Sequence, residues 1–172
     1  MKTTAVIPVA GMGTRLRPLT YTQPKPLIPV AGKPILGYIV DDLIETGIDR
    51  FVFVIGYLGD KIKIYIDEHY PDIEKEFAVQ SKREGLGHAV WTARDAFADA
   101  PNVIIVLGDT IFDTEVEDIV DSETSCFAVK QVQDPRDFGV VEKDEKGRVQ
   151  KVIEKPKIPK SNLAMVGMYN IH

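Results

Sequence analysis

Residues 3–15 read Thr-Thr-Ala-Val-Ile-Pro-Val-Ala-Gly-Met-Gly-Thr-Arg, an apolar run that passes directly into a glycine-rich loop. A short apolar run that ends at Ala-Gly is typical of a strand buried on both faces. Two closely spaced glycines, Gly11 and Gly13, let backbone N–H groups approach and wrap a phosphate group. A tight turn that needs glycine for steric reasons explains the same residues equally well, so both interpretations stay open at this point.

Strand and helix patterns alternate up to about residue 110. Strands are expected at Thr3–Val9, Arg50–Ile55, Phe77–Gln80 and Val103–Leu107, and helices at 34–46, Lys61–Tyr70 and Gly85–Phe97. This alternation predicts an α/β, three-layer α/β/α domain with a mostly parallel, Rossmann-like sheet. Later strand patterns at Cys126–Val132 and Ala164–Ile171 flank a hairpin of Phe138–Lys143 and Arg148–Lys155. These patterns predict a small β insertion.

Composition limits the classes of partner. A chain of 172 residues normally forms one domain, and its formal net charge of −5 argues against binding to nucleic acid. A small anionic substrate remains compatible, because a local cluster of Arg and Lys can oppose the global sign. The single cysteine excludes an internal disulfide. Because no apolar run approaches the ~20 residues needed to span a bilayer, we expect a cytoplasmic protein with no membrane partner. The sequence leaves the oligomeric state open, and a homo-oligomer is compatible with it.

Two familiar phosphate-binding motifs do not fit the loop. A dinucleotide fingerprint needs a third Gly or Ala where this chain has Leu16. A P-loop needs Ser or Thr after Gly-Lys, whereas Pro34 follows Lys33. The loop is therefore expected to bind phosphate in another way.

A longer pattern surrounds the glycines. The stretches Ala10–Thr20, Gln23–Val30 and Gly32–Pro34 resemble the signature of the sugar-1-phosphate nucleotidyltransferase family. Further matches follow in the family's order: Gln80, Gly85–Ala89, Gly108–Asp109, Phe138–Val140, Glu154–Pro156 and Val166–Gly167. Because these positions combine several residue types and extend over essentially the whole chain, chance is a poor explanation.

The resemblance implies a specific reaction. A nucleotidyl group passes from a nucleoside triphosphate to a hexose 1-phosphate, pyrophosphate leaves, and Mg²⁺ is the cofactor. No enzyme nucleophile is needed, because a sugar phosphate is mostly dianionic at pH 7, its second pKa being about 6. Positioning of two polyanions and stabilisation of the leaving group then carry most of the catalysis.

The phosphate side is expected to involve the glycine loop and two basic residues. The loop residues assigned to the nucleotide are Ala10, Gly11, Gly13 and Thr14. Arg15 follows them directly and is placed to hold the β- and γ-phosphates. Lys25, framed by the stiff residues Pro24 and Pro26, is expected to bridge the α-phosphate and the incoming sugar phosphate. A solvated surface charge is the alternative for both basic side chains.

Asp109 is the expected metal ligand. It closes the most buried strand, and ligands bind at the carboxyl ends of strands in open parallel sheets. A carboxylate there suits Mg²⁺, whereas a helix N-cap is the alternative; nearby Asp113 is expected to be solvated. The resemblance places a second metal-binding Asp beyond the last strand seen here, and Thr110 stands where relatives often have Asn or Asp. We therefore expect either a fragment of a longer enzyme, which binds nucleotide but turns over poorly, or a non-catalytic module.

Gln80 is the candidate base reader. It ends a strand, and its amide offers a donor and an acceptor that match the N3–H and carbonyl edge of a pyrimidine. The resemblance places this glutamine at the base, with Gly85 and Gly87 letting the backbone approach the base or ribose. His88 is expected to be a packed or helix-start histidine rather than a catalyst.

The sugar phosphate site rests on the resemblance alone. It would consist of Gly139, Glu154, Lys155, Val166 and Gly167. Glu154 would accept hydrogen bonds from sugar hydroxyls, and Lys155 would reach the sugar phosphate. An ion pair on the hairpin is the alternative for these two charged residues.

Residues 1–172 are expected to form one nucleotidyltransferase domain, with a nucleotide-binding half over about residues 1–110 and a sugar-binding, β-rich half over about 111–172. Transfer of a uridylyl or thymidylyl group to glucose 1-phosphate is the favoured activity. A mannose-1-phosphate guanylyltransferase is the runner-up within the class. The alternative from another class is a non-catalytic module that senses nucleotide sugars or binds other subunits.

Overall fold

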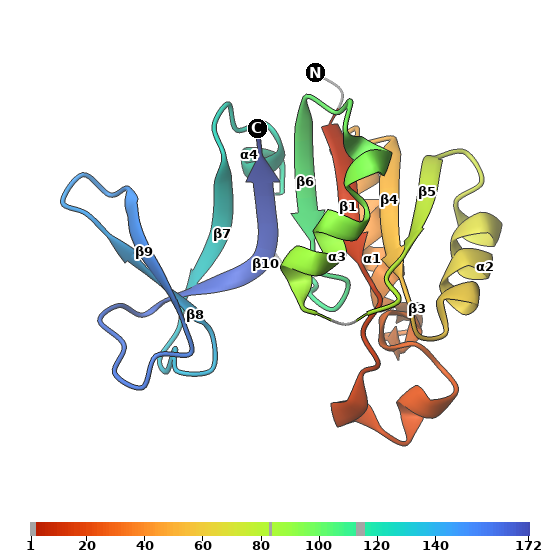
Figure 1. The fold of residues 1–172 in the computed structure, drawn as a ribbon, viewed down its shortest axis with the longest axis horizontal. Helices are drawn as coiled ribbons and strands as arrows, with labels where there is room; N and C mark the ends of the chain where they lie inside the picture. The colour runs from red at the N-terminus through yellow and green to blue at the C-terminus, as the bar shows by residue number, and fades with distance from the viewer. Residues whose placement is uncertain (1–2, 83, 113–115) are drawn as a thin grey trace.

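The computed structural model describes residues 3–82, 84–112 and 116–172. Within these residues one sheet has the strand order β5-β4-β1-β6-β10-β8-β9, and β7 pairs with β10 (Figure 1). Its strands are β1 (Thr3–Pro8), β4 (Arg50–Ile55), β5 (Glu74–Val79), β6 (Asn102–Val106), β7 (Cys126–Gln131), β8 (Gly139–Lys143), β9 (Val149–Glu154) and β10 (Leu163–Ile171).

The first four strands of the order, from β5 to β6, run parallel. In register, Ala5 of β1 lies between Phe51 of β4 and Ile104 of β6, so these strands end at a common edge. β10 then pairs antiparallel with β6, and β7 and β8 pair antiparallel with β10. The shared carboxyl edge of the parallel strands is therefore the place where a ligand site is expected.

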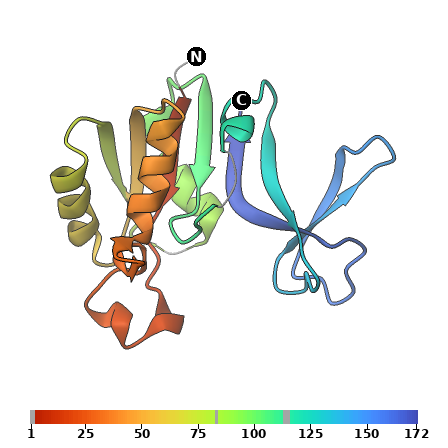
Figure 2. The ribbon, with the colours of Figure 1, turned by 180° about the vertical axis from the view of Figure 1, so that it is seen from behind.

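Helices cover both faces of the parallel strands. Helices α1 (Ile35–Glu45) and α2 (Gly59–His69) lie on one face, and α3 (Leu86–Thr92) lies on the other (Figures 1 and 2). Side chains alternate accordingly: Phe51 and Phe53 pack in the larger core cluster with residues of α1 and α2, while Val52 and Val54 pack with Ala89 of α3. The predicted three-layer α/β class with a mostly parallel Rossmann-like sheet is confirmed.

Several element boundaries differ from the sequence prediction. β5 begins at Glu74, whereas the sequence predicted a start at Phe77. The prediction missed the first residues of the strand because they are charged and do not belong to an apolar run. The helix expected to run to Phe97 ends at Thr92, whose hydroxyl donates to the His88 carbonyl, and a 3₁₀ helix follows over Arg94–Phe97. This back-bonding competes with the helical pattern. The short helix α4 (Glu117–Val120) was not predicted.

Residues 11–34 form an ordered loop beyond the carboxyl ends of β1 and β4 (Figure 1). The loop contains 3₁₀ helices at Thr14–Leu16, Leu19–Tyr21 and Lys25–Leu27 and a small ladder of β2 (Pro29–Val30) with β3 (Lys33–Pro34). The Tyr57 hydroxyl donates to the Tyr21 carbonyl at 2.9 Å, and Lys61 Nζ donates to the Thr22 carbonyl at 2.6 Å. These contacts tie the loop to the segment that begins α2. Pro34 is extended and precedes α1, instead of lying in its first turn as predicted.

The predicted hairpin is formed by β8 and β9. Its turn is held by Asp144, whose Oδ1 accepts the backbone N–H groups of Lys146 and Arg148 at 2.9 Å each. These backbone bonds, with the Arg148 side chain, hold the pKa of the Asp144 carboxyl below its ordinary value. In the part of the chain that the structure describes, no helix is both long enough and apolar enough to cross a bilayer.

Candidate active site

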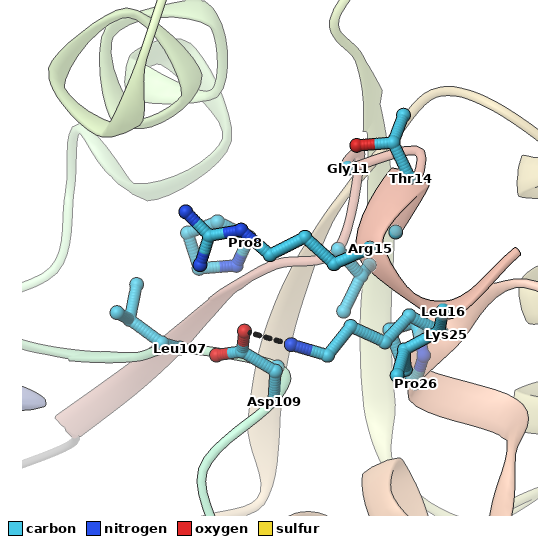
Figure 3. A pocket seen from close by; sticks show the side chains of 12 residues that line it. Pro8, Gly11, Thr14, Arg15, Leu16, Lys25, Pro26, Leu107 and Asp109 are labelled. Atoms are coloured by element: carbon cyan, nitrogen blue, oxygen red, sulfur yellow. Dashed lines mark hydrogen bonds and ion pairs between the residues drawn. The ribbon is translucent and has the colours of Figure 1, made fainter.

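A pocket of about 360 Å³ lies where β1 and β6 end (Figure 3). Its lining residues include Gly11, Gly13, Thr14, Arg15, Lys25 and Asp109. They come from three separate segments: the glycine loop, the 3₁₀ helix at Lys25–Leu27 and the end of β6. The structure thus brings the predicted phosphate and metal residues to one place, because the parallel strands share a carboxyl edge.

Gly13 has two steric reasons to be glycine. Its backbone is left-handed, with φ of 58°, and an added Cβ would lie 2.8 Å from Thr20 Cγ2 and 3.0 Å from Lys25 Cβ. The Thr20 hydroxyl also donates to the Gly13 carbonyl at 2.8 Å. Gly11 differs, since a Cβ there would meet open space. The tight-turn interpretation therefore accounts for Gly13, while Gly11 leaves the pocket side of the backbone open.

Lys25 and Asp109 form an ion pair across the pocket. Lys25 Nζ lies 2.5 Å from Asp109 Oδ2, although the residues are 84 positions apart (Figure 3). Both side chains are partly exposed, at 33% and 44%. Asp109 is not the N-cap of a described helix, since Val116 caps α4. Its carboxylate faces the pocket cation instead, which sets aside the N-cap alternative.

Arg15 extends from the glycine loop toward the same pocket, which Pro8 also lines (Figure 3). The residue is exposed, and no ion pair joins it to another residue that the structure describes. Arg15 and Lys25 thus place two positive side chains at the wall of one cavity. Such a pair favours a polyanionic ligand even in a chain whose net charge is −5.

A second pocket, of about 220 Å³, adjoins the first. Its lining includes Ala10, Gly11, Gln80, Gly85, Leu86 and Ala89. Pro8 and Gly11 line both pockets, so the two spaces share a wall. Of the residues assigned to the base side, Gln80 and Gly85 lie here, whereas Gly87 lines neither pocket.

The predicted sugar residues gather around β8, β9 and β10. Gly139 pairs with Glu154 in register, and a Cβ on Gly139 would lie 3.3 Å from Glu154 Oε2 and 3.1 Å from Met165 Sδ. Lys155 Nζ lies 3.7 Å from Glu154 Oε1, and both side chains are mostly exposed. This exposed contact is the hairpin ion pair that was the alternative to a role of Glu154 and Lys155 at the sugar. None of these residues lines the pocket that contains Asp109.

β10 connects the predicted sugar residues to the turn that carries Asp109. The Leu107 N–H donates to the Gly167 carbonyl at 2.8 Å, and a Cβ on Gly167 would lie 2.9 Å from three Leu107 side-chain carbons. Gly167 thus lets β10 approach the turn that carries Asp109, while Val166 precedes it in the strand. Burial, with a smaller contribution from the charge of Glu154, raises the pKa of the Tyr169 phenol. Tyr169 therefore stays neutral at physiological pH.

Among the residues that the structure describes, a metal ion would find one carboxylate in the first pocket, that of Asp109. Among residues 3–82, 84–112 and 116–172, no group of three or more His, Cys, Asp or Glu side chains is arranged to hold a metal. Asp113 lies outside the described residues. The donor set therefore fits a hard cation that takes most of its ligands from substrate phosphates and water, as Mg²⁺ commonly does.

Two features of the site were not predicted from the sequence. Pro8 lines both pockets, and His88 Nδ1 lies 2.9 Å from Gln80 Nε2. His88 was expected to be a packed or helix-start residue, and it does lie in the first turn of α3. Both residues stand in stretches that resemble the family, but no pattern in the sequence indicates the contact between them.

Comparison with known proteins assigns the chain to a family. Residues 4–171 match the family model described as nucleotidyl transferase. The chain belongs to this family. The resemblance to sugar-1-phosphate nucleotidyltransferases seen in the sequence is thereby confirmed.

Relatives of this nucleotidyl transferase chain include two proteins of Haloferax volcanii. It is 40% identical over 166 residues to the low-salt glycan biosynthesis nucleotidyltransferase Agl11, covering 92% of this chain and 46% of Agl11. It is 37% identical over 172 residues to the UTP–glucose-1-phosphate uridylyltransferase AglF, covering 96% of this chain and 70% of AglF. The chain spans less than half the length of several curated relatives that it matches.

A solved structure has the same fold. It is a Bacillus anthracis protein described as a glucose-1-phosphate thymidylyltransferase, in complex with a sucrose. The match covers 98% of this chain and 71% of the other, with a TM-score of 0.88 and 27% identity.

Proposed function

We propose that this chain contributes the site of an enzyme that transfers a uridylyl or thymidylyl group from UTP or dTTP to a hexose 1-phosphate, with glucose 1-phosphate as the preferred acceptor. The observation that carries the proposal is the convergence of Arg15, Lys25 and Asp109 in one pocket beside an open glycine backbone. The similarity to AglF and to a protein described as a glucose-1-phosphate thymidylyltransferase supports both the reaction class and the choice of a pyrimidine.

The proposed reaction is a direct displacement at phosphorus. A phosphate oxygen of the sugar phosphate forms a bond to the α-phosphorus, and the bond from that phosphorus to the bridging oxygen of the β-phosphate breaks. Pyrophosphate leaves with the electron pair. Lys25 would neutralise charge where the two substrates meet, and Arg15 would hold the departing β- and γ-phosphates. Positioned cations of this kind stabilise a transition state whose charge moves toward the leaving group.

Mg²⁺ is the proposed cofactor, with Asp109 as its protein ligand. When bound, the ion would supply charge neutralisation on the phosphate oxygens. The Asp109 carboxylate now contacts Lys25 at 2.5 Å, so ligand binding would require Lys25 to turn toward a phosphate. Lys25 and Asp109 are both partly exposed, which leaves their side chains room to separate.

The two halves of the chain are proposed to divide the substrates. Residues up to about 110 would hold the nucleotide, with Ala10, Gly11, Gly13 and Thr14 along the phosphates and ribose and Gln80, Gly85 and Gly87 at the base. Residues from about 111 would hold the sugar phosphate through Gly139, Glu154, Lys155, Val166 and Gly167. The contact of Gly167 with Leu107 supports this arrangement, since it joins the second half to the Asp109 turn.

A substrate panel tests the proposal. Pyrophosphate release with Mg²⁺ is measured for UTP, dTTP, GTP and ATP, each with glucose 1-phosphate and with mannose 1-phosphate, beside calorimetric nucleotide binding. We expect the highest rate with a pyrimidine triphosphate and glucose 1-phosphate. Preference for GTP with mannose 1-phosphate would instead support the guanylyltransferase alternative. Nucleotide-sugar binding without turnover by the intact protein would support a non-catalytic sensing module.

The Arg15→Ala variant is expected to lose turnover while keeping its stability. Arg15 is exposed and makes no ion pair with another described residue, so little folding free energy depends on it. Its proposed contacts with the leaving phosphates put the loss on kcat, by about 100-fold. Turnover and thermal melts are compared with those of Arg94→Ala, an exposed arginine after α3. A fall in melting temperature with normal kcat would make Arg15 structural.

The Gln80→Ala variant is expected to lose preference for UTP over GTP. A buried amide that pairs with the base edge contributes about 1–3 kcal/mol, because its removal leaves base groups unpaired. Gln80 is 7% exposed and lines the second pocket. Calorimetric Kd values for UTP and GTP are measured beside those of Gln150→Ala, an exposed glutamine of β9. An unchanged ratio of the two Kd values contradicts the assignment of Gln80 to the base.

A further inference from the structure

The amide of Gln80 is held in one orientation by two contacts. Gln80 follows β5, and its backbone N–H donates to the Ile55 carbonyl at 2.9 Å, which anchors the residue at the end of the sheet. Its Nε2 donates to the Gly85 carbonyl at 3.4 Å and lies 2.9 Å from His88 Nδ1. A carbonyl oxygen can only accept, so the 3.4 Å contact with Gly85 supports the same orientation of the amide independently of the histidine.

This orientation requires a particular form of His88. Because Gln80 Nε2 donates, His88 Nδ1 must accept, and the proton of a neutral imidazole then sits on Nε2. Glu84 Oε2 lies 3.8 Å from Nε2, whereas Gln80 contacts the other ring nitrogen, Nδ1. The Glu84 carboxylate therefore favours the tautomer that the Gln80 contact needs.

The two contacts leave the oxygen of the amide for the pocket. Both hydrogens of Gln80 Nε2 are directed to Gly85 and His88, and among the described residues no hydrogen bond reaches Gln80 Oε1. Gln80 also lines the second pocket, beside Gly11 and Leu86. The polar group that the pocket offers from this side chain is consequently an acceptor.

A hydrogen-bond acceptor at this position distinguishes pyrimidine bases by whether the ring nitrogen N3 carries a hydrogen. Uracil and thymine carry N3–H and can donate to Gln80 Oε1. Cytosine presents a lone pair at N3, so two acceptors would face each other. Reversal of the amide would reverse this preference, since Nε2 would then face the base.

We propose that His88 is a positioning residue that fixes the Gln80 amide and thereby selects a uracil or thymine base over cytosine. The inference rests on the proposed function, which puts a pyrimidine in the second pocket. His88 acts through Gln80 and has no contact with the reacting phosphates. Its effect is therefore on the choice of base rather than on the chemical step.

The experiment measures Kd for UTP and CTP by calorimetry in the wild type, His88→Ala, His88→Asn and Gln80→Ala. We expect His88→Ala to lower the preference for UTP over CTP by about tenfold, because the Gln80 amide can then reverse its orientation. His88→Asn should restore most of it, since asparagine carries an acceptor oxygen on Cγ, where histidine carries Nδ1. His69→Ala, on the α2 surface, is the control and should leave the ratio unchanged. Thermal melts are used to check that each variant is folded.

The outcomes separate the two proposals. An unchanged UTP-to-CTP ratio in folded His88→Ala, with a lowered ratio in Gln80→Ala, overturns the role of His88 and leaves the proposed function intact. A lowered ratio in His88→Asn equal to that in His88→Ala also overturns it, because loss of packing rather than loss of the acceptor would then be the cause. Absence of UTP and dTTP binding by the wild type overturns the proposed function and this inference with it.

Discussion

The Phe53→Ala variant is expected to lose about 3–5 kcal/mol of unfolding free energy, as is typical for a buried phenylalanine. Phe53 is fully buried in the middle of β4, and its ring stacks with Phe51 at 6.0 Å and with Phe77 at 5.6 Å between centroids. Helices α1 and α2 cover this face of the sheet (Figure 2). Because the packed neighbours can relax only partly, a cavity remains and adds to the loss of buried apolar area.

Urea unfolding followed by far-UV circular dichroism measures this loss. Circular dichroism is preferred because the single tryptophan, Trp91, is 65% exposed and reports poorly on the core. Ile64→Ala is the control, since Ile64 is also apolar but is 55% exposed on α2. We expect it to cost less than about 1 kcal/mol. Equal losses in the two variants would contradict the assignment of the core to this side of the sheet.

The fold was predictable where burial leaves a simple pattern in the sequence. β1, β4 and β6 lie between two layers of helices, so their residues are apolar on both faces and form continuous runs. β5 is an edge strand with a partly exposed, charged first half, and the same criterion found only its end. The 3₁₀ helices of the loop had no such signal, because turns of three residues bury too few side chains to produce a period.

The sequence singled out the candidate residues of the site, but it did not predict their contacts. Gly13, Lys25 and Asp109 stand in motifs, and the parallel topology accounts for their arrival at one edge. The pairing of Lys25 with Asp109, across 84 residues, depends on side-chain directions that the sequence does not encode locally. The Gln80–His88 contact has the same character, because it joins a strand end to a helix start across a loop. The assignment of Glu154 and Lys155 to the sugar stays a prediction.

The ion pair between Lys25 and Asp109 links stability and function in this site. Both side chains are partly exposed, so the pair contributes at most about 1 kcal/mol to folding. The position of the pair matters more than this energy, because Asp109 keeps the ammonium group of Lys25 in the pocket before any ligand binds. Removal of either charge should therefore change ligand binding and turnover far more than it changes the melting temperature.

The Lys25→Met variant is expected to lower kcat for pyrophosphate release by about 100- to 1,000-fold, the size seen when one positioned stabilising group is removed from an active site. Methionine keeps an unbranched side chain of similar length, so the packing of the stem beside Gly13 should survive. The loss of charge would leave the meeting point of the two phosphates without its protein cation. We expect the melting temperature to stay close to that of the wild type.

Three measurements separate this role from a structural one. Steady-state kinetics of the active enzyme at varied sugar phosphate should show a rise in KM as well as the fall in kcat, because Lys25 is proposed to contact both substrates. Lys25→Arg should recover only part of the rate, since a planar guanidinium differs in shape from an ammonium group. Lys63→Met, an exposed lysine on α2, is the control and should keep full activity. Normal kcat in Lys25→Met would mean that Lys25 serves Asp109 alone, and the proposed displacement would then need a different cation.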